Sequence, residues 1–257
     1  MKIISDTHMH SFFSFDGGNS AAEMAAAAYE KGLKYICFTE HHNVNPDFYK
    51  PVSFDEYLET VSELREQYRG RMTILAGIEY DRPESFPDEL RRVQGYKLDM
   101  IMGSMHDALG EYIGTPEPFT HHTPEEILRE HYRLTVIAAQ QGMFDVVGHF
   151  DLPLRSSPDP DVDLREERLA ALRAVAENGI AIEINTNGLR VPYGRTLPTQ
   201  SVLREFAELG GKYVLFGSDA HCTKDIASFF DVPGGYDLCG LTPGVFIERK
   251  FVPVYDL

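Results

Sequence analysis

The feature of this chain that most restricts its fold is an unbroken alternation of short apolar segments with longer segments of helical periodicity. The apolar segments are rich in β-branched or aromatic residues and are bounded by turn-forming residues, which is typical of buried strands. Strands that alternate with helices indicate a parallel sheet with helices on its outside. We therefore predict an α/β fold, best satisfied by a closed barrel of parallel strands, with an open doubly wound sheet as the alternative. The seven predicted strands are Lys2–Asp6, Lys34–Thr39, Thr73–Ile78, Asp99–Ser104, Phe144–Gly148, Ala181–Asn185 and Tyr213–Gly217.

Helix starts are predicted where a serine, threonine or aspartate is followed three residues later by glutamate, because the two side chains can satisfy unpaired amides of the first turn. This pattern occurs at Ser20, Ser53, Thr123 and Asp163. The segment Pro243–Val254 contains a further candidate strand.

Side chains that can bind a metal or donate hydrogen bonds follow every predicted strand. In a parallel barrel the carboxyl ends of the strands converge on one face, where such folds keep their active sites. Residues i and i+2 of a strand point to the same side. His8 and His10 can therefore contact one centre, and Asp219 and His221 can do the same. The other candidates, in strand order, are the triplet Glu40-His41-His42, then Glu79, His106, His149 and Asn185.

Imidazoles and carboxylates in one place suit Zn, Mn or Fe. The candidate ligands exceed the needs of a single four-coordinate site, so we predict two or three divalent metal ions, with a carboxylate such as Glu79 as a bridge. Clusters of this kind serve in-line attack at phosphorus, because they stabilise both the entering and the leaving oxygen. Three other histidines are expected outside the cluster: His121 and His122 in a solvated loop, and His131 on the surface of a helix.

Composition narrows the classes of function. The 257 residues include 24 basic and 40 acidic side chains, which gives a formal net charge of −16. Such a charge disfavours a broad nucleic-acid-binding surface, which depends on Lys and Arg. The sequence has no GxSxG elbow, P-loop or GxGxxG fingerprint, which disfavours the chemistries that those motifs serve. The three cysteines, at 37, 222 and 239, form neither a disulfide framework nor a zinc motif.

No linker or repeat divides residues 1–257, so we expect a single domain. The N-terminus lacks the apolar core of a signal peptide, and no apolar run is long enough to span a bilayer. The expected location is therefore the cytoplasm, with no membrane or nucleic-acid partner. The sequence does not indicate an oligomeric state.

Six short motifs match, in chain order, those of a known family. They are DTHMHS at 6–11, FTEHH at 38–42, GIEYD at 77–81, GSMHD at 103–107, GHFDL at 148–152 and GSDAH at 217–221. On these motifs the chain resembles the PHP superfamily (polymerase and histidinol phosphatase) and, within it, the HisK-type histidinol-phosphatases. The resemblance implies one metallophosphoesterase domain with a distorted (β/α)7, TIM-like barrel. It also implies up to three divalent metals at the C-terminal ends of the strands.

The resemblance also implies a ligand set for each metal. Asp16 stands where a histidine is usual in the superfamily, and a carboxylate there is a feature of the histidinol-phosphatase branch. Glu40 stands where many relatives have aspartate, and we expect it to support the ligands without binding a metal. The implied sets are His8, His10, Glu79 and Asp219 for the first metal, Glu79, His106 and His149 for the second, and Asp16, His41 and His221 for the third.

The implied reaction is hydrolysis of a small phosphomonoester by attack of a metal-bridging hydroxide. L-histidinol phosphate is the favoured substrate, which would place the protein in histidine biosynthesis. The segment EINTNGLR at 183–190 resembles the same branch and supplies Arg190, and Arg155 is placed like the other phosphate-binding arginine of that branch. His42 is the candidate catalytic and substrate-facing residue, whose protonated form would neutralise the leaving alkoxide.

Three alternatives stay open from the sequence. A nucleotide phosphatase or nuclease of the same superfamily would need an open groove with basic or aromatic residues, and the sequence has no basic stripe. A protein-tyrosine phosphatase would need a wider mouth. A non-catalytic metal-binding protein would hold metal and hydrolyse no phosphoester.

Overall fold

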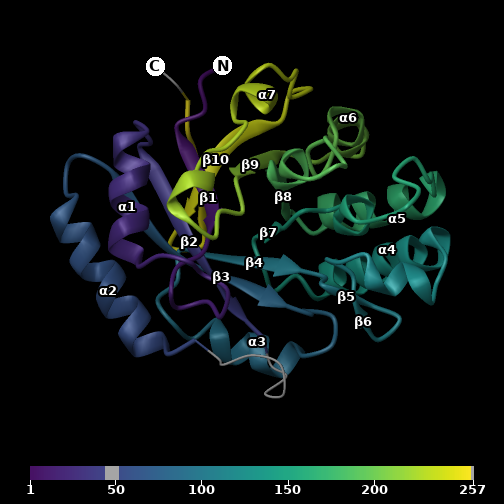
Figure 1. Ribbon diagram of the computed structural model, residues 1–257, viewed down its shortest axis with the longest axis horizontal. Helices are drawn as coiled ribbons and strands as arrows, with labels where there is room; N and C mark the ends of the chain where they lie inside the picture. The colour runs from purple at the N-terminus through teal and green to yellow at the C-terminus, as the bar shows by residue number, and fades with distance from the viewer. Residues whose placement is uncertain (44–51, 256–257) are drawn as a thin grey trace.

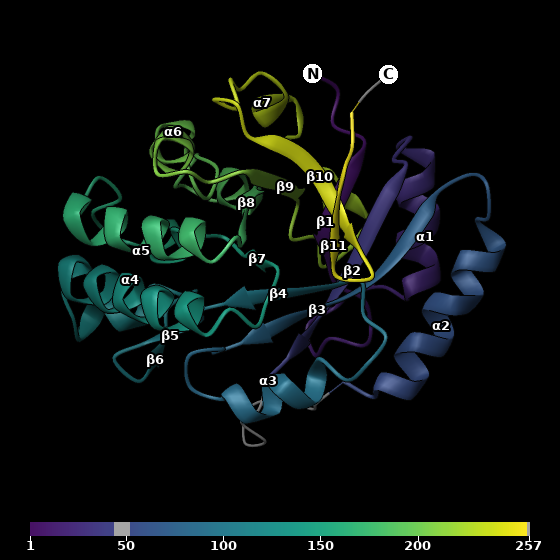
Figure 2. The same ribbon diagram turned by 180° about the vertical axis from the view of Figure 1, so that it is seen from behind.

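A computed structural model describes residues 1–43 and 52–255 of the chain. At its centre lies a curved sheet, and helices surround the outside of this sheet (Figures 1 and 2). Neighbouring strands are parallel, except that the last strand runs antiparallel to the one before it. In sheet order the strands are β1 (Ser5–Met9), β2 (Tyr35–His42), β3 (Thr73–Asp81), β4 (Met100–Ser104), β7 (Val146–Val147), β8 (Ala181–Asn185), β9 (Tyr213–Gly217), β10 (Thr242–Ile247) and β11 (Lys250–Pro253). A small separate hairpin consists of β5 (Asp107–Ala108) and β6 (Glu111–Tyr112).

The helices are α1 (Ala21–Glu30), α2 (Phe54–Gln67), α3 (Pro87–Val93), α4 (Pro124–Gln141), α5 (Arg165–Glu177), α6 (Gln200–Glu208) and the short α7 (Asp231–Gly234). Ser20 and Thr123 form the predicted reciprocal caps at the starts of α1 and α4. Ser53 is confirmed as the residue that precedes α2, but its side chain makes no cap bond. The predicted start at Asp163 is wrong, because α5 begins two residues later and Leu164 precedes it. None of the helices in the described ranges is long and apolar enough to cross a lipid bilayer.

The predicted α/β class with a mostly parallel sheet is confirmed, but closure into a barrel is not. The hydrogen-bonded order has β1 at one edge and β11 at the other. The sheet curls until β1 lies beside the residues after β9, where the Asp219 amide donates to the His8 carbonyl at 2.8 Å. No continuous ladder forms in this part of the structure, because β10 pairs with β9 at Tyr213 and Val214 and a bulge interrupts β1.

The predicted strand positions hold, and the largest shifts lie at the ends. β8 and β9 have the predicted bounds, while β1 begins at Ser5 rather than Lys2. β2 and β3 each run three residues beyond their predicted ends, through polar residues. The segment after residue 242 supplies the hairpin β10–β11.

Alternate residues of each strand enter two separate cores. On β2, Ile36 and Phe38 pack in the core between sheet and helices, whereas Cys37 packs in a second core inside the curve of the sheet. On β3, Ile78 belongs to the outer core and Leu75 to the inner one. This alternation continues past the apolar part of each strand, and therefore decides which polar side chains point inward at its end.

Replacing Tyr57 with phenylalanine should destabilise the fold by about 1–3 kcal/mol. The buried Tyr57 hydroxyl lies 2.8 Å from the Gly77 carbonyl and 3.0 Å from the Gly77 amide, so it ties α2 to β3. Phenylalanine fills the same space but leaves these backbone groups without their partner. Urea denaturation measures the change in unfolding free energy. A variant as stable as the wild type would show that the hydrogen bonds contribute nothing net.

Candidate metal centre

All nine predicted metal ligands meet in one cluster at the carboxyl ends of the strands. Its deepest part consists of four atoms from three strand ends. His8 Nε2 lies 3.5 Å from Glu79 Oε2 and 3.6 Å from Asp219 Oδ1. His10 Nε2 lies 3.6 Å and 3.5 Å from the same two oxygens.

These four atoms fit a divalent metal ion. His8 Nε2 and His10 Nε2 are buried and have no hydrogen-bond partner, whereas Glu79 Oε2 lies 2.9 Å from His41 Nδ1. Buried polar atoms are almost always paired, so two unpaired imidazole nitrogens that face the same two carboxylate oxygens need a common partner. Ligand atoms around a tetrahedral ion at 2.0–2.2 Å lie about 3.3–3.6 Å apart. The observed spacing and the imidazole–carboxylate chemistry both match that requirement.

Glu79 faces a second group of ligands with its other oxygen. Glu79 Oε1 lies 2.8 Å from His149 Nε2 and 3.3 Å from His106 Nε2. Those two nitrogens are 3.2 Å apart, and the Ser104 hydroxyl donates to the same oxygen at 2.6 Å. The two oxygens of Glu79 therefore face different sets of histidines.

A third group lies at the mouth of the cluster. Asp16 Oδ2 is 3.2 Å from His221 Nε2 and 3.6 Å from His41 Nε2. The ring of His10 stacks on those of His41 and His221, with 4.2 Å between centroids. The Asp16 side chain is about a third exposed, so this group is open to solvent.

The charges in the cluster are strongly coupled. Burial raises the pKa of the Glu79 carboxyl, but the imidazoles of His8, His106 and His41 outweigh burial and hold that pKa well below its usual value. Burial, together with His41 and His221, lowers the pKa of His10 well below its usual value. Glu79 is therefore a carboxylate and His10 a neutral imidazole, which are the forms that bind metals.

Other buried side chains fix the ring orientations of the ligands. The Ser14 hydroxyl donates to Glu40 Oε2 at 2.6 Å and lies 3.2 Å from His10 Nδ1. Since its one proton is used on Glu40, Ser14 must accept a proton from His10 Nδ1, which leaves the lone pair of Nε2 facing the cluster. At His106, the Asp81 carboxylate plays the role that Ser14 plays at His10: Asp81 Oδ1 lies 3.1 Å from His106 Nδ1.

The sequence reasoning did not single out Ser14, Asp81 or Glu183. Glu183 lies on β8, is fully buried, and contacts both His8 and the backbone of His149. One signal was available in the sequence, because a carboxylate at the centre of the apolar strand AIEIN is costly to bury without a partner.

The structure does not bring His42 to the cluster. His41 points inward from β2, so its neighbour His42 points outward. There His42 Nε2 lies 3.1 Å from Glu89 Oε1, and its ring packs against those of Phe54 and Tyr80. The predicted catalytic and substrate-facing role of His42 does not agree with this position.

The two arginines named from the sequence, Arg155 and Arg190, border the cluster. Arg155 donates to the Asn187 side-chain oxygen at 3.2 Å, and Asn187 donates to Asp219 Oδ2 at 3.0 Å. Arg190 donates to the carbonyls of Ser218 and Asp219 at 2.7 and 2.8 Å. Both arginines are partly exposed, and both are linked to Asp219.

The expectation for His131 is wrong. It lies on α4 but is 1% exposed, and its Nε2 donates to the Phe150 carbonyl at 2.7 Å. Burial lowers its pKa to about 4. His121 and His122 behave as expected, since they lie in a loop near the surface beside Glu111.

His131 should make the protein less stable in mild acid. Its pKa is about 4 in the folded protein and 6.5 unfolded, so the unfolded chain binds more protons between these values. The unfolding free energy therefore falls as pH drops from 6.5 to 4, by up to about 3 kcal/mol. His131→Gln, which keeps an N–H donor but does not titrate, should remove this part of the pH dependence. Denaturation at pH 7 and at pH 4.5 measures the difference, and parallel curves for the two proteins would contradict it.

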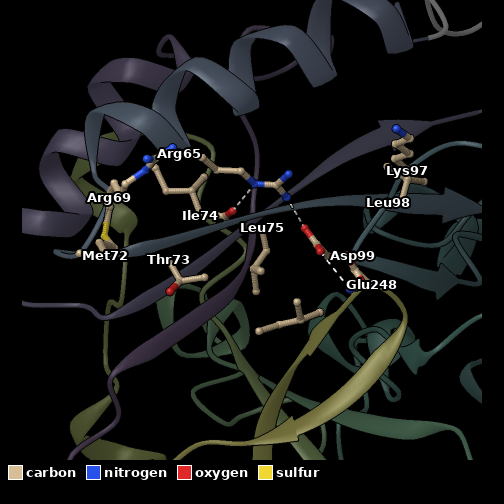
Figure 3. A pocket seen from close by; sticks show the side chains of 12 residues that line it. Arg65, Arg69, Met72, Thr73, Ile74, Leu75, Lys97, Leu98, Asp99 and Glu248 are labelled. Carbon is tan, nitrogen blue, oxygen red and sulfur yellow. Dashed lines mark hydrogen bonds and ion pairs between the residues drawn. The ribbon is translucent and has the colours of Figure 1, made fainter.

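A large cavity of ≈ 730 Å³ lies at the other end of the sheet. Figure 3 shows its charged side chains: Arg65 reaches the Ile74 carbonyl and Asp99, and Asp99 accepts from the Glu248 amide. These groups join α2, the sheet and the β10–β11 turn. The Arg65–Asp99 pair therefore has a structural role in this cavity, and the cluster is the candidate functional site.

Comparison with known proteins agrees with this geometry. The model of the PHP domain family matches residues 6–187. A Deinococcus radiodurans protein named "Probable histidinol-phosphatase" is 31% identical, covering 90% of this chain and 91% of its own length. The histidinol-phosphatase of Lactococcus lactis subsp. lactis is 30% identical, covering 85% of this chain and 84% of its own.

A crystal structure of histidinol phosphate phosphatase from L. lactis, in complex with zinc, L-histidinol and phosphate, has the same fold. The TM-score is 0.86 with 25% identity, and the match covers 96% of this chain and 98% of that one. With the family model, the relatives and the ligand cluster in agreement, this chain belongs to the PHP domain family.

Proposed function

We propose that this protein hydrolyses L-histidinol phosphate to L-histidinol and phosphate, and that the reaction depends on divalent metal ions. The observation that carries the proposal is the pair of buried, unpaired imidazole nitrogens of His8 and His10, which face carboxylate oxygens of Glu79 and Asp219 around one point. The named relatives and the crystal structure with zinc, histidinol and phosphate support the choice of substrate.

We assign two or three ions, of Zn, Mn or Fe, to the cluster. Divalent ions bound there would lower the pKa of water and neutralise charge on phosphate oxygens. The protein holds Glu79 between the two inner sets and keeps Asp16 at the mouth. The proposed ligands are His8, His10, Glu79 and Asp219; Glu79, His106 and His149; and Asp16, His41 and His221. We further infer that residues 1–257 form one domain around this centre.

Arg155 and Arg190 would bind the phosphate group of the substrate. Guanidinium groups suit phosphate because they present paired donors in a fixed fork. They lie on the 3₁₀ turns after β7 and β8. Arg190 contacts the Asp219 carbonyl directly, and Arg155 is linked to Asp219 through Asn187. His42 has no part in this proposal, because it points into the helix layer.

Phosphate release from L-histidinol phosphate by protein loaded with Mn²⁺ or Zn²⁺ tests the proposal. Nucleotides, a phosphotyrosine peptide and single-stranded DNA serve as competing substrates. We expect strong preference for histidinol phosphate and loss of activity on chelation. Preference for a nucleotide, a phosphopeptide or DNA would overturn the substrate assignment and leave the metal site standing. Metal binding without hydrolysis of any phosphoester would overturn the enzymatic proposal.

A further inference from the structure

Packing of the fold does not explain why position 183 is a carboxylate. On β8, Ala181 belongs to the core inside the curved sheet, and Ile182 and Ile184 belong to the core beneath the helices. Alternation therefore directs Glu183 into the sheet interior, where it is 0% exposed. Burying a carboxylate is costly unless it is paired, so the contacts of this one have to explain it.

The two oxygens of Glu183 contact two different ligand-bearing segments. Oε1 lies 2.7 Å from His8 Nδ1, and Oε2 accepts from the His149 backbone amide at 2.7 Å. His8 stands on β1 and His149 just after β7, so one carboxylate joins segments from distant parts of the chain. The Nε2 atoms of both histidines point to opposite oxygens of Glu79, at 3.5 and 2.8 Å.

Each contact constrains one ligand in a specific way. A proton held on His8 Nδ1 by Glu183 leaves the lone pair on Nε2, which is the atom that faces the cluster. His149 has a backbone φ of +26°, in the left-handed region that residues other than glycine rarely adopt. The hydrogen bond from its amide to Glu183 holds the backbone in that conformation.

Gly217 provides independent support, because its lack of a side chain makes room for the contact. A Cβ atom at this position would lie 1.9 Å from Glu183 Oε1 and 2.6 Å from His8 Cβ. The space beside the His8–Glu183 pair therefore has to be free of any side chain from β9. A methyl group at 217 would push the pair apart without changing any charge.

We propose that Glu183 is a positioning residue that sets His8 and His149 together, so that metal ions on either side of Glu79 bind as a coupled pair. This inference rests on the proposed function for its use of metals. It concerns a residue outside the ligand set and does not depend on the identity of the substrate.

Titration of the metal-free full-length chain with Mn²⁺, followed by calorimetry and electron paramagnetic resonance, tests the proposal. Glu183→Gln keeps the shape but can no longer accept from both donors, and Gly217→Ala displaces the pair with its charge intact. We expect each variant to bind Mn²⁺ about 10–100-fold more weakly than the wild type. With histidinol phosphate, kcat should fall while KM stays within about threefold, because the arginines are untouched.

Asp99→Asn is the matched control. Asp99, labelled in Figure 3, is also a buried carboxylate that accepts from two backbone amides. It lines the cavity at the other end of the sheet and lies outside the cluster. Its Mn²⁺ affinity should equal that of the wild type. Wild-type affinity in both Glu183→Gln and Gly217→Ala, or an equal loss in Asp99→Asn, would overturn the proposal.

A measurement on the unaltered protein covers the case in which the variants do not fold. Long-range ¹H–¹⁵N correlation of the zinc-loaded wild type should show His8 with its proton on Nδ1. A proton on Nε2 would overturn the proposal. A wild type that binds Mn²⁺ and hydrolyses no histidinol phosphate would defeat the proposed function and leave these tests of Glu183 valid.

Discussion

Replacing Glu79 with glutamine should lower kcat for histidinol phosphate by on the order of 10³-fold or more. Glu79 is the one cluster residue whose two oxygens face different groups of histidines. An amide has one acceptor oxygen, and its NH₂ group would point its protons at one of those groups. Glu79→Gln should therefore lose metal from both sides of the residue and not from one alone.

Metal content after gel filtration, measured with kcat on the same samples, checks this expectation. Glu84→Gln is a suitable control, because the Glu84 side chain is only 5% exposed and lies outside the cluster. It should keep the metal content and the rate of the wild type. A Glu79→Gln protein with full metal content and a rate within tenfold of the wild type would contradict the bridging assignment.

Periodicity in the sequence located the strands because it depends on local physics. A few residues are enough to recognise an apolar strand between turn-forming residues. For this reason β8 and β9 have the predicted bounds. The predicted ends of β2 and β3 are too early for a physical reason. Polar residues normally mark the end of a buried strand, but here Glu79 and its neighbours stay in the ladder because the cluster buries them.

The same alternation could have placed His42 correctly. Thr39 and His41 share one face of β2, and the face of His42 is that of Phe38, which lies in the outer core. Strand alternation alone therefore predicts that the ring of His41 points inward and the ring of His42 points outward. The two histidines are adjacent in the motif FTEHH, but the alternation of the strand places their rings on opposite faces of the sheet.

Two features could not be predicted locally, because they depend on which distant segments meet. Closure of the sheet depends on whether β10 or β1 occupies the edge of β9, and the sequence of β9 does not encode that choice. The role of Glu183 depends on His8, 175 positions away, and on the absence of a side chain at Gly217. The ligands could be predicted from motifs, whereas their supports come from tertiary contacts.

Replacing Arg190 with alanine should lower kcat/KM for histidinol phosphate by about 10²–10³-fold. In addition to any phosphate contact, its guanidinium holds the carbonyls of Ser218 and Asp219. Asp219 has a backbone φ of +53°, so the segment that presents its carboxylate to the cluster needs external support. Arg190→Lys should recover little activity, because a single ammonium group cannot reproduce the planar fork.

Inhibition by inorganic phosphate separates the two parts of the Arg190 effect. If the guanidinium binds phosphate, the inhibition constant should rise in Arg190→Ala even when saturating Mn²⁺ restores full metal content. If the arginine only supports Asp219, Mn²⁺ affinity should fall and phosphate inhibition of the loaded protein should stay unchanged.

Arg195→Ala is the control, because Arg195 is exposed near the same turn and pairs with Asp161 at 2.7 Å. We expect the first result, since Arg190 is partly exposed beside a cluster whose metal ions would attract the same anion. Unchanged kinetics in Arg190→Ala would remove this arginine from the site altogether.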